Sequence, residues 1–486
     1  VEERRNAAQA WRAAADAVIA EYRALEDDYL QARAEDLAGV ARRVLEHLLT
    51  GGPSPPALAG PGIVVASSLT PTDTVALDPA LVQGIATATG GPTSHSAILA
   101  RSLGIPAAVG LGDALVSVPE GTPLILDGDA GLLLIDPSPD VTADYETRGK
   151  EREARERAAR KGARRPSVTQ DGTRIEVAAN VGSPEETEAA VNAGADGIGL
   201  LRTEFLFLGR DAMPDEEEQE AAYRRVAEIL AGRPLILRTL DVGADKPLSY
   251  LPRAEEDNPY LGLRGIRLGL AQPELLSIQL RAALRVAADH PVKVMFPMVT
   301  TVEELEMGLG LVTEARVALG WTEGWAPEGF ALGVMVEVPA AALTAGALAA
   351  MVDFLSIGTN DLSQYVTAAD RGNDRVAPLA DALHPAVLRL VRMVVEGADG
   401  HGRWVGVCGE VAADPVAVPI LLGLGVRELS VAPPAVAAIK QAVREADLGQ
   451  ARALAVSALR LESAGAVRAL LSPPAEAGGP TAASGS

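Results

Sequence analysis

The chain has 486 residues, enough for two or three domains, and 48% of them are hydrophobic while only 3% are aromatic, so its cores should be aliphatic. A formal net charge of −22 argues against nucleic acid and anionic membranes as partners, whereas a basic protein partner stays possible. The single cysteine excludes an internal disulfide and suits a reducing compartment. No apolar run has the form of a signal peptide or a membrane span, so we expect a cytoplasmic protein.

The first 50 residues are rich in Ala, Arg and Glu at helical spacing. They predict two antiparallel helices with a break near residues 26–29 or at Gly39. Such a hairpin cannot bury both of its faces, so it needs a partner or a larger bundle of which it is one part. Residues 51–56 form a Gly- and Pro-rich linker, and we assign residues 1–52 to a partial helical module.

The next segment, residues 53–140, alternates short β-like runs with small helices and predicts a small α/β domain. The expected strands cover residues 63–66, 85–87, 107–109, 123–127 and 132–135.

His95 lies in the middle of this segment, between a glycine-rich turn at Gly90 and the first turn of a predicted helix that Thr93 or Ser94 can cap. Unpaired N–H groups and the helix dipole favour an anion at such a position. Imidazole is a nucleophile at neutral pH, because much of it is unprotonated there. His95 is therefore a candidate phosphoryl acceptor, and the alternative is a histidine that only caps the helix.

Residues 141–166 are dominated by Glu, Arg and Lys, with opposite charges three and four positions apart, which predicts a solvated connecting helix. From about residue 170 the pattern changes to eight strand-then-helix units, which predict a (β/α)8 barrel over residues 167–472. The final segment, 473–486, is rich in Pro, Gly, Ala and Ser and is expected to be a disordered tail. The expected barrel strands cover residues 176–180, 197–202, 235–240, 292–298, 332–337, 354–358, 406–409 and 428–431.

Polar side chains stand where the predicted barrel strands end, which is the face at which barrel enzymes do their chemistry. Several arginines on one face favour a multiply charged anion, because guanidinium groups pair with carboxylate and phosphate oxygens. Glu337 and Asp361 supply hard oxygen ligands of the kind that Mg²⁺ prefers. The strand-end residues are Arg202, Glu204, Arg238, Asp241, Glu337, Asn360, Asp361, Cys408 and Glu410, with Arg264 and Arg371 in nearby loops.

Each of these residues also has a structural interpretation when it is taken alone. An arginine or a carboxylate at a strand end can form an ion pair that only stabilises the fold. Cys408 can be a small buried apolar residue instead of a group that exchanges a proton. Polar residues at five strand ends together favour a functional site.

Taken together, these segments resemble enzyme I of the bacterial phosphoenolpyruvate-dependent sugar phosphotransferase system, from about residue 10 to residue 450. The resemblance implies a swivelling α/β phosphohistidine domain followed by a (β/α)8 barrel that binds phosphoenolpyruvate. Its most specific motifs are Gly-Gly-Pro-Thr-Ser-His over 90–95, Leu-Arg-Thr-Glu-Phe-Leu-Phe over 201–207, Ser-Ile-Gly-Thr-Asn-Asp-Leu-Ser-Gln-Tyr over 356–365 and Gly-Val-Cys-Gly-Glu over 406–410.

The resemblance also implies a reaction and a role for each matched residue. The phosphoryl group of phosphoenolpyruvate passes to His95 and then to a histidine of a small phosphocarrier protein, and pyruvate is released. Cys408 protonates the enolate carbon. By motif position the substrate is held by Arg202, Arg238, Asn360 and Arg371 with help from Arg264 and Asp361, Mg²⁺ is bound by Glu337 and Asp361, and the barrel forms a homodimer.

Family members carry a further stretch before the segment that corresponds to residue 1. It supplies an opening strand and the first helices of the carrier-docking module, so we expect carrier docking to be weakened and one sheet edge to be exposed. Two alternatives stay open. One is a fragment of a dikinase or of phosphoenolpyruvate synthase, and the other is a protein that binds phosphoenolpyruvate as a sensor without turnover.

Overall fold

A computed structural model of the chain describes residues 6–23, 34, 37, 39–41, 44–45, 48, 60–69, 77–78, 80–91, 97, 100, 104–128, 130–243, 248, 250–251, 256–321, 327–373 and 375–471. The predicted linker over 51–56, His95 and the predicted tail over 473–486 lie outside these residues. The chain divides into two compact units, Val1–Glu151 and Arg152–Ser486.

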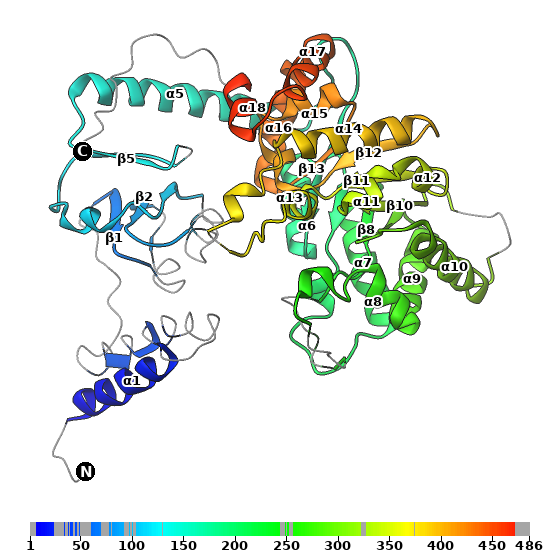
Figure 1. The fold of residues 1–486 in the computed structure, drawn as a ribbon, viewed down its shortest axis with the longest axis horizontal. Helices are drawn as coiled ribbons and strands as arrows, with labels where there is room; N and C mark the ends of the chain where they lie inside the picture. The colour runs from blue at the N-terminus through cyan, green and yellow to red at the C-terminus, as the bar shows by residue number, and fades with distance from the viewer. Residues whose placement is uncertain are drawn as a thin grey trace. The chain divides into compact units, whose positions relative to one another are not determined.

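The first unit begins with helix α1 (Ala7–Arg23), drawn in blue in Figure 1. The chain folds back onto this helix, because the Trp11 indole Nε1 donates a hydrogen bond to the Ala41 carbonyl oxygen over 3.0 Å. Ile19, Ala34 and Ala41 are buried together in a small apolar cluster. These contacts agree with a helical hairpin, although most of its predicted second helix lies outside the described residues.

The rest of the first unit holds two small sheets. The strands are β1 (Gly62–Ala66), β2 (Val82–Thr87), β3 (Ala107–Ala108), β4 (Leu124–Asp127) and β5 (Leu132–Ile135), with the 3₁₀ helix η1 (Asp113–Ser117) between β3 and β4. The first three strands form a parallel sheet in the order β1-β2-β3, and β4 and β5 form an antiparallel pair. Among the described residues β1 pairs on one side only, with β2.

Helix α5 (Pro139–Gly162) runs across the boundary between the two units. It is a solvated helix, since Ala159 is its one buried residue, and its exposed faces carry ion pairs four residues apart such as Arg152–Glu156. The helix begins at a proline, which is favoured in the first turn. It ends before Pro166, because the residue preceding a proline avoids the helical conformation.

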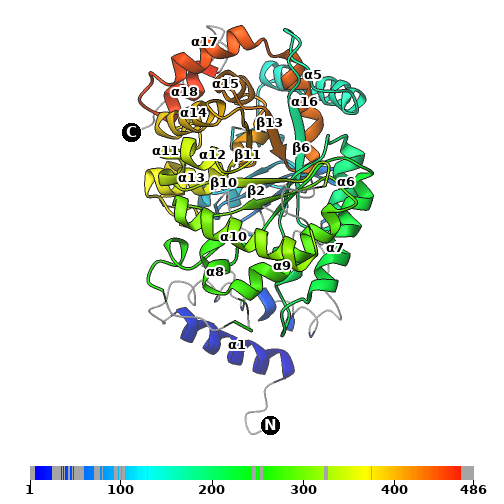
Figure 2. The ribbon, with the colours of Figure 1, turned by 90° about the vertical axis from the view of Figure 1, so that its right-hand side faces the viewer.

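The second unit is a closed barrel of eight parallel strands, so the predicted fold class is confirmed. Each strand pairs with its neighbour in sequence, and the last pairs with the first, as in the register Leu429↔Val177. Figure 2 shows helices surrounding the strands of this unit. The strands are β6 (Glu176–Val181), β7 (Ile198–Leu201), β8 (Leu235–Arg238), β9 (Val292–Phe296), β10 (Ala331–Val336), β11 (Phe354–Ile357), β12 (Trp404–Val407) and β13 (Glu428–Val431).

Strand β12 begins two residues earlier than the predicted range 406–409. Trp404 pairs in register with Phe354 of β11, and their rings stack with centroids 4.8 Å apart. This aromatic pair inside the barrel holds the start of β12 in the sheet. Cys408 therefore lies just beyond the end of the strand and not within it.

The helices of the barrel bury one face against the strands. In α14 the buried residues include Val387, Leu388, Val391 and Val394, the spacing of a single helical face. The α-helices are α6 (Pro184–Ala193), α7 (Glu216–Leu230), α8 (Ile266–Ala271), α9 (Pro273–Ala287), α10 (Val302–Ala318), α11 (Pro339–Leu343), α12 (Ala345–Ala349), α13 (Thr359–Thr367), α14 (Pro385–Asp399), α15 (Val418–Leu424), α16 (Val436–Glu445), α17 (Leu448–Ala458) and α18 (Ala464–Leu471). Short 3₁₀ helices are η2 (Glu204–Leu206), η3 (Pro259–Leu261), η4 (Ala377–Leu379), η5 (Glu410–Ala413) and η6 (Pro433–Ala435).

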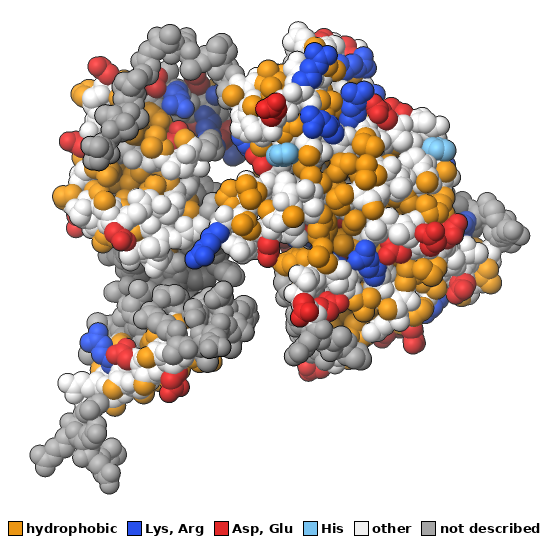
Figure 3. All heavy atoms as spheres, viewed as in Figure 1, with side chains coloured by type: hydrophobic (Ala, Val, Ile, Leu, Met, Phe, Trp, Pro, Cys, Tyr) orange, Lys and Arg blue, Asp and Glu red, His pale blue; other side chains and the backbone are white. Residues whose placement is uncertain are grey.

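The interior of the barrel has its own apolar layer, made by Leu200, Ile236, Met295, Met335 and Phe354. Cys408 belongs to the same cluster, so this layer reaches the carboxyl ends of the strands. On the face of the barrel unit seen in Figure 3, acidic, basic and hydrophobic side chains are mixed. In the part of the chain that the structure describes, every helix is too short or too polar to cross a bilayer.

Candidate active site at the mouth of the barrel

Most of the residues predicted from strand ends lie at one end of the barrel. Arg202 follows β7, Arg238 is the last residue of β8, Glu337 follows β10, Asp361 lies in the first turn of α13 after β11, and Cys408 follows β12. Because all eight strands are parallel, their carboxyl ends meet at the same face. The barrel thus brings together residues that are up to about 200 positions apart in sequence.

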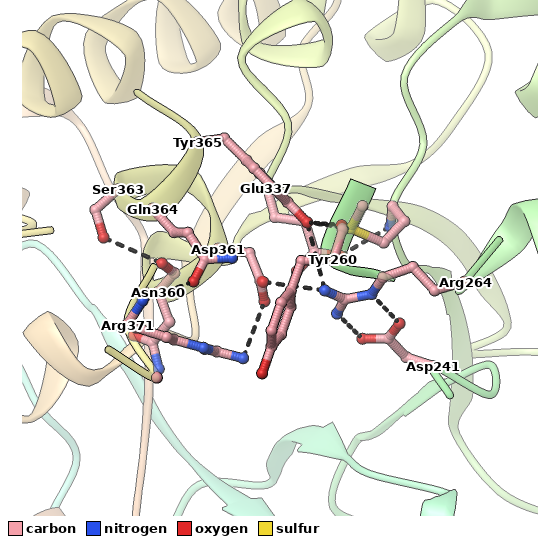
Figure 4. Close-up of polar contacts among 12 residues, drawn as sticks. Asp241, Tyr260, Arg264, Glu337, Asn360, Asp361, Ser363, Gln364, Tyr365 and Arg371 are labelled. Carbon is pink, nitrogen blue, oxygen red and sulfur yellow. Dashed lines mark hydrogen bonds and ion pairs between the residues drawn. The ribbon is translucent and has the colours of Figure 1, made fainter. Parts of the chain in front are cut away.

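Arg264 is the most firmly held of the predicted arginines, and it is buried. Its Nε and Nη2 donate to the two carboxylate oxygens of Asp241 over 3.1 and 2.8 Å, and its Nη1 donates to Asp361 Oδ1 over 3.2 Å. Figure 4 shows this guanidinium between the two carboxylates. Burial favours the neutral form, but Asp241 and then Asp361 outweigh it and hold the pKa of Arg264 well above its usual range. Arg264 is therefore a fixed cation.

Arg238 is held in a similar way by a second pair of acids. Its Nη2 donates to Glu204 Oε1 over 2.8 Å, and its Nη1 lies 3.1 Å from Asp241 Oδ2. Burial opposes its charge, but Glu204 and Asp241 more than compensate, so the pKa of Arg238 is raised. Its Nε is buried and has no hydrogen-bond partner among the described residues. That N–H is a donor suited to an anion in the mouth.

Arg371 and Arg202 are the more exposed arginines of the set. Arg371 Nη2 lies 3.7 Å from Asp361 Oδ2, and the backbone N–H of Arg371 donates to Gln364 Oε1 over 3.0 Å. The side chain of Arg202 is exposed. Its pKa is lowered, because the guanidinium loses hydration in the mouth and because the Arg238 cation lies nearby. Arg371 thus adds a cation beside Asp361, and Arg202 adds one near Arg238.

Glu337 is buried and interacts electrostatically with Arg238 and Arg264. Its Oε1 accepts a hydrogen bond from the Met298 N–H over 2.8 Å. Burial, then the nearby carboxylates of Asp361 and Asp241, raise the pKa of Glu337 to about 8, against the partial opposition of Arg238 and Arg264. Glu337 and Asp361 are close enough to repel each other, and a divalent cation between them would relieve that repulsion.

Asn360 links the ends of β11 and β12. Its Oδ1 accepts from the Glu410 N–H over 2.9 Å, and its Nδ2 donates to Glu410 Oε1 over 3.4 Å. The preceding Thr359 has a buried Oγ1 without a hydrogen-bond partner in the described part of the chain. Because α13 begins at the end of β11, its unpaired first-turn N–H groups lie at the mouth, where they favour an anion.

Cys408 is the one cysteine of the chain and is buried at the end of β12. Its Sγ donates to the Ile357 carbonyl oxygen over 3.6 Å. Burial raises the pKa of the thiol to about 11, while Ser356 opposes this shift and Glu337 adds to it. At neutral pH Cys408 is therefore a thiol with a proton to give and not a thiolate nucleophile.

Several residues of the site have no predicted role in the sequence. Asp241 joins Arg238 to Arg264, and the Tyr365 hydroxyl accepts from Arg264 Nη1 over 3.4 Å while donating to the Tyr260 carbonyl oxygen over 2.5 Å. Helical spacing gives a signal for one of them, since Tyr365 lies one turn after Asp361 on α13. Nothing in the sequence pattern identifies the Tyr260 carbonyl oxygen.

The described residues contain no group of three or more His, Cys, Asp or Glu side chains that could hold a metal alone. Glu337 and Asp361 are the two carboxylates at the mouth that would hold a hard cation. Mg²⁺ commonly uses one or two carboxylates and completes its shell with substrate oxygens and water. The pair thus fits a metal that is bound together with a phosphorylated substrate.

Comparisons with known families divide the chain in the same two parts. The family described as PEP-utilising enzyme, PEP-binding domain, matches residues 156–448, which include all eight barrel strands. The family described as PEP-utilising enzyme, mobile domain, matches residues 58–131, which include position 95.

Curated relatives extend this similarity over most of the chain. The multiphosphoryl transfer protein of Rhodobacter capsulatus is 47% identical over 456 residues, or 92% of this chain and 53% of its own. The phosphoenolpyruvate-protein phosphotransferase of Bacillus sp. (strain S) is 45% identical over 91% of this chain and 78% of its own. That of Staphylococcus carnosus (strain TM300) is 42% identical over 94% of this chain and 80% of its own. The chain thus spans about half of the first relative and about four fifths of the other two.

Proposed function

The chain belongs to the phosphoenolpyruvate-utilising enzymes, among the phosphoenolpyruvate-protein phosphotransferases, and on that premise we propose that it performs the first step of a sugar phosphotransferase system. In this reaction the phosphoryl group of phosphoenolpyruvate passes to His95 and then to a histidine of a small phosphocarrier protein. The observation that carries the proposal is the cluster of Arg238, Arg264 and Arg371 around the carboxylates of Asp241 and Asp361 at the barrel mouth.

The fixed charges at the mouth suit phosphoenolpyruvate, which carries a phosphate and a carboxylate. Arg238 and Arg264 are already oriented by Asp241, so little reorganisation is needed when the substrate binds. Arg202, Arg371 and Asn360 complete the pocket around the substrate. Preorganised positive charge stabilises the negative charge that is redistributed as the phosphorus–oxygen bond breaks.

We assign Glu337 and Asp361 as the ligands that hold Mg²⁺ together with substrate oxygens. Burial and then the repulsion between the two groups raise the pKa of Glu337, which disfavours two bare carboxylates and supports this assignment. The ion, when bound, supplies positive charge to the phosphate and carboxylate oxygens of the substrate.

Cys408 completes the reaction by protonating the enolate. As the bond between the bridging oxygen and phosphorus breaks, His95 forms a bond to phosphorus and the enolate of pyruvate is left. The Cys408 S–H bond then breaks and its proton forms a C–H bond at C3, so that pyruvate and a thiolate result. The raised pKa of the thiol supports this role, because the thiol keeps its proton until the strongly basic enolate appears.

The remaining features of the proposal come from the family. His95 travels between the barrel mouth and the carrier, the barrel forms a homodimer, and the protein acts in the cytoplasm. The single cysteine, Cys408, supports a reducing compartment.

A turnover assay with a purified phosphocarrier tests the proposal. With phosphoenolpyruvate and Mg²⁺, the chain should release pyruvate continuously and transfer labelled phosphorus to the carrier histidine. Binding of phosphoenolpyruvate without pyruvate release would refute the proposal in favour of a sensor. Pyruvate release that requires a nucleotide and inorganic phosphate would instead identify a dikinase fragment.

A further inference from the structure

Three adjacent barrel strands place Ser356, Gly406 and Glu428 side by side inside the barrel. Ser356 of β11 pairs in register with Gly406 of β12, and Gly406 pairs with Glu428 of β13. Neighbouring strands are about 4.8 Å apart, so the backbones of β11 and β13 at Ser356 and Glu428 are about 10 Å apart along this row. Gly406 contributes no side chain, and the atoms nearest to the position of its missing Cβ are Glu428 Oε1, Glu428 Cβ and Trp404 Cζ3, so the glutamate and the indole ring border the space beside it.

Glu428 is a buried carboxyl group, 3% exposed, that extends into this space. A Cβ added to Gly406 would lie 3.2 Å from Glu428 Oε1, and one added to Gly199 would lie 2.7 Å from the same oxygen and would collide with Ser430 Oγ. Oε1 has no hydrogen-bond partner within the described residues. The glycines therefore make room for an acid whose oxygen is not satisfied by the protein.

Ser356 is the second unsatisfied group in this row. It is fully buried, and its Oγ likewise lacks a hydrogen-bond partner in the described ranges. Ser356 also lies close to Cys408, because it pairs in register with Gly406, two residues before Cys408, and the Cys408 N–H donates to the carbonyl oxygen of Ile357, the residue after Ser356. Burial raises the pKa of the thiol, and the Ser356 hydroxyl opposes that shift. Ser356 thus lies near the proton donor of the proposed reaction and in the same register row as Glu428.

We propose that a buried water bridges Glu428 Oε1 and Ser356 Oγ, and that this row returns a proton to Cys408 after each turnover. The inference rests on the proposed function, because it starts from the Cys408 thiolate. Buried waters occupy polar spaces and bond to two to four partners. Glu428, Ser356 and Ser430 provide three here. Ser356 and Glu428 act through Cys408 and touch no atom of the substrate.

The proton transfers balance within the row. The Cys408 thiolate takes the hydroxyl proton of Ser356, Ser356 takes one from the water, and the water takes the carboxyl proton of Glu428. The net result is a restored thiol and a Glu428 carboxylate, which regains a proton from solvent at the amino-terminal end of the barrel. No oxidant or other reactant is needed.

The charges around Glu428 suit a proton reservoir. Burial raises the pKa of Glu428 to about 7. The Lys293 cation of β9 opposes this shift, and the Glu176 carboxylate of β6 adds to it. The acid is thus partly protonated at neutral pH, and its proton moves downhill to a thiol whose pKa is about 11. Lys293 itself lies 4.8 Å from the centroid of the Trp404 ring. Glu176 is half-buried at the start of its strand and connects the row to solvent.

The relay predicts a difference between net turnover and isotope exchange. Net pyruvate formation with an excess of carrier requires a new proton on Cys408 in every cycle. Exchange of ¹³C-labelled pyruvate into phosphoenolpyruvate at equilibrium, without carrier, reuses the same proton and does not need the relay. Ser356→Ala and Glu428→Gln should each slow net turnover about tenfold or more and leave the exchange rate unchanged.

Ser167→Ala is the matched control, because Ser167 is also a fully buried serine without a hydrogen-bond partner in the described residues. It should change neither rate. Equal losses of turnover and exchange in the relay variants would show a structural defect and overturn the relay, and so would unchanged turnover in either variant. A wild-type protein that shows neither rate would refute the proposed function itself. If the wild type shows exchange and the Ser356→Ala and Glu428→Gln variants keep the wild-type rate of net turnover, only the relay is refuted.

Discussion

Asp241 offers a sharp test of the charge network at the barrel mouth. Its carboxylate contacts Arg238 Nη1 at 3.1 Å and both Nε and Nη2 of Arg264 at 3.1 and 2.8 Å. Asp241→Asn keeps the size of the side chain but removes its charge, and it leaves two buried guanidinium groups under-compensated. Removing one partner of a buried ion pair typically costs about 3 to 5 kcal/mol. We expect the free energy of unfolding of the barrel to fall by about 3 kcal/mol, at the lower end of that range, because Glu204 and Asp361 remain.

Urea unfolding followed by tryptophan fluorescence measures this loss, because Trp404 is stacked on Phe354 inside the barrel. The matched control is Glu396→Gln, which breaks the pair between Arg392 Nε and Glu396 Oε1 at 2.6 Å. Both of those side chains are more than half exposed, so the control should lose less than about 1 kcal/mol.

Phosphoenolpyruvate should stabilise the Asp241→Asn variant more than it stabilises the wild type. An anion in the mouth supplies part of the negative charge that the variant lacks, so ligand binding and folding are more strongly linked. Equal losses in Asp241→Asn and Glu396→Gln, or a variant that gains no more from the ligand than the wild type, would refute the reasoning.

Three further predictions follow from the site. His95→Ala should abolish phosphorylation of the chain, seen by intact mass, and leave phosphoenolpyruvate binding nearly intact in a titration; loss of binding would contradict two separate sites. Cys408→Ala should slow pyruvate formation about 10²- to 10⁴-fold, with a much smaller change in substrate affinity, and an unchanged rate would remove Cys408 from the mechanism. Burial raises the pKa of Glu428 from 4.5 to about 7, so the wild-type free energy of unfolding should fall by about 3 kcal/mol as the pH rises across that interval. Glu428→Gln should remove this decrease in urea titrations, and an identical slope in both proteins would show that Glu428 is not the titrating group.

The barrel could be predicted because its signal is repeated. Each unit contains a short buried strand, polar residues mark five of the eight strand ends, and eight repeats fix the architecture even where a strand is displaced. The displacement of β12 illustrates the limit, since its start depends on the stacking of Trp404 on Phe354 from another strand. Strand ends were likewise sufficient to predict that Arg202, Arg238, Glu337 and Cys408 lie at one end of the barrel, while their roles stay predictions.

The partners that orient these groups could not be predicted from sequence. Arg264 reaches Asp361 from a loop that is 97 residues away, and only the closed barrel brings the two together. The burial of Glu428 could not be predicted for a different reason. A charged residue at the first position of a strand normally lies in solvent, whereas here Gly199 and Gly406 leave space for it inside the barrel. His95 remains a prediction from its motif, because it lies outside the described residues.

The central claim is that one arginine-lined mouth supplies the phosphorus that His95 receives. Rapid mixing of the chain with phosphoenolpyruvate and Mg²⁺, without carrier, tests it most directly when pyruvate and phosphohistidine are both quantified in the first turnover. The account predicts equal amounts of the two products, appearing together, with the phosphoryl group located on His95 by peptide mass. Pyruvate accompanied by free phosphate, or a phosphoryl group on another residue, would contradict it.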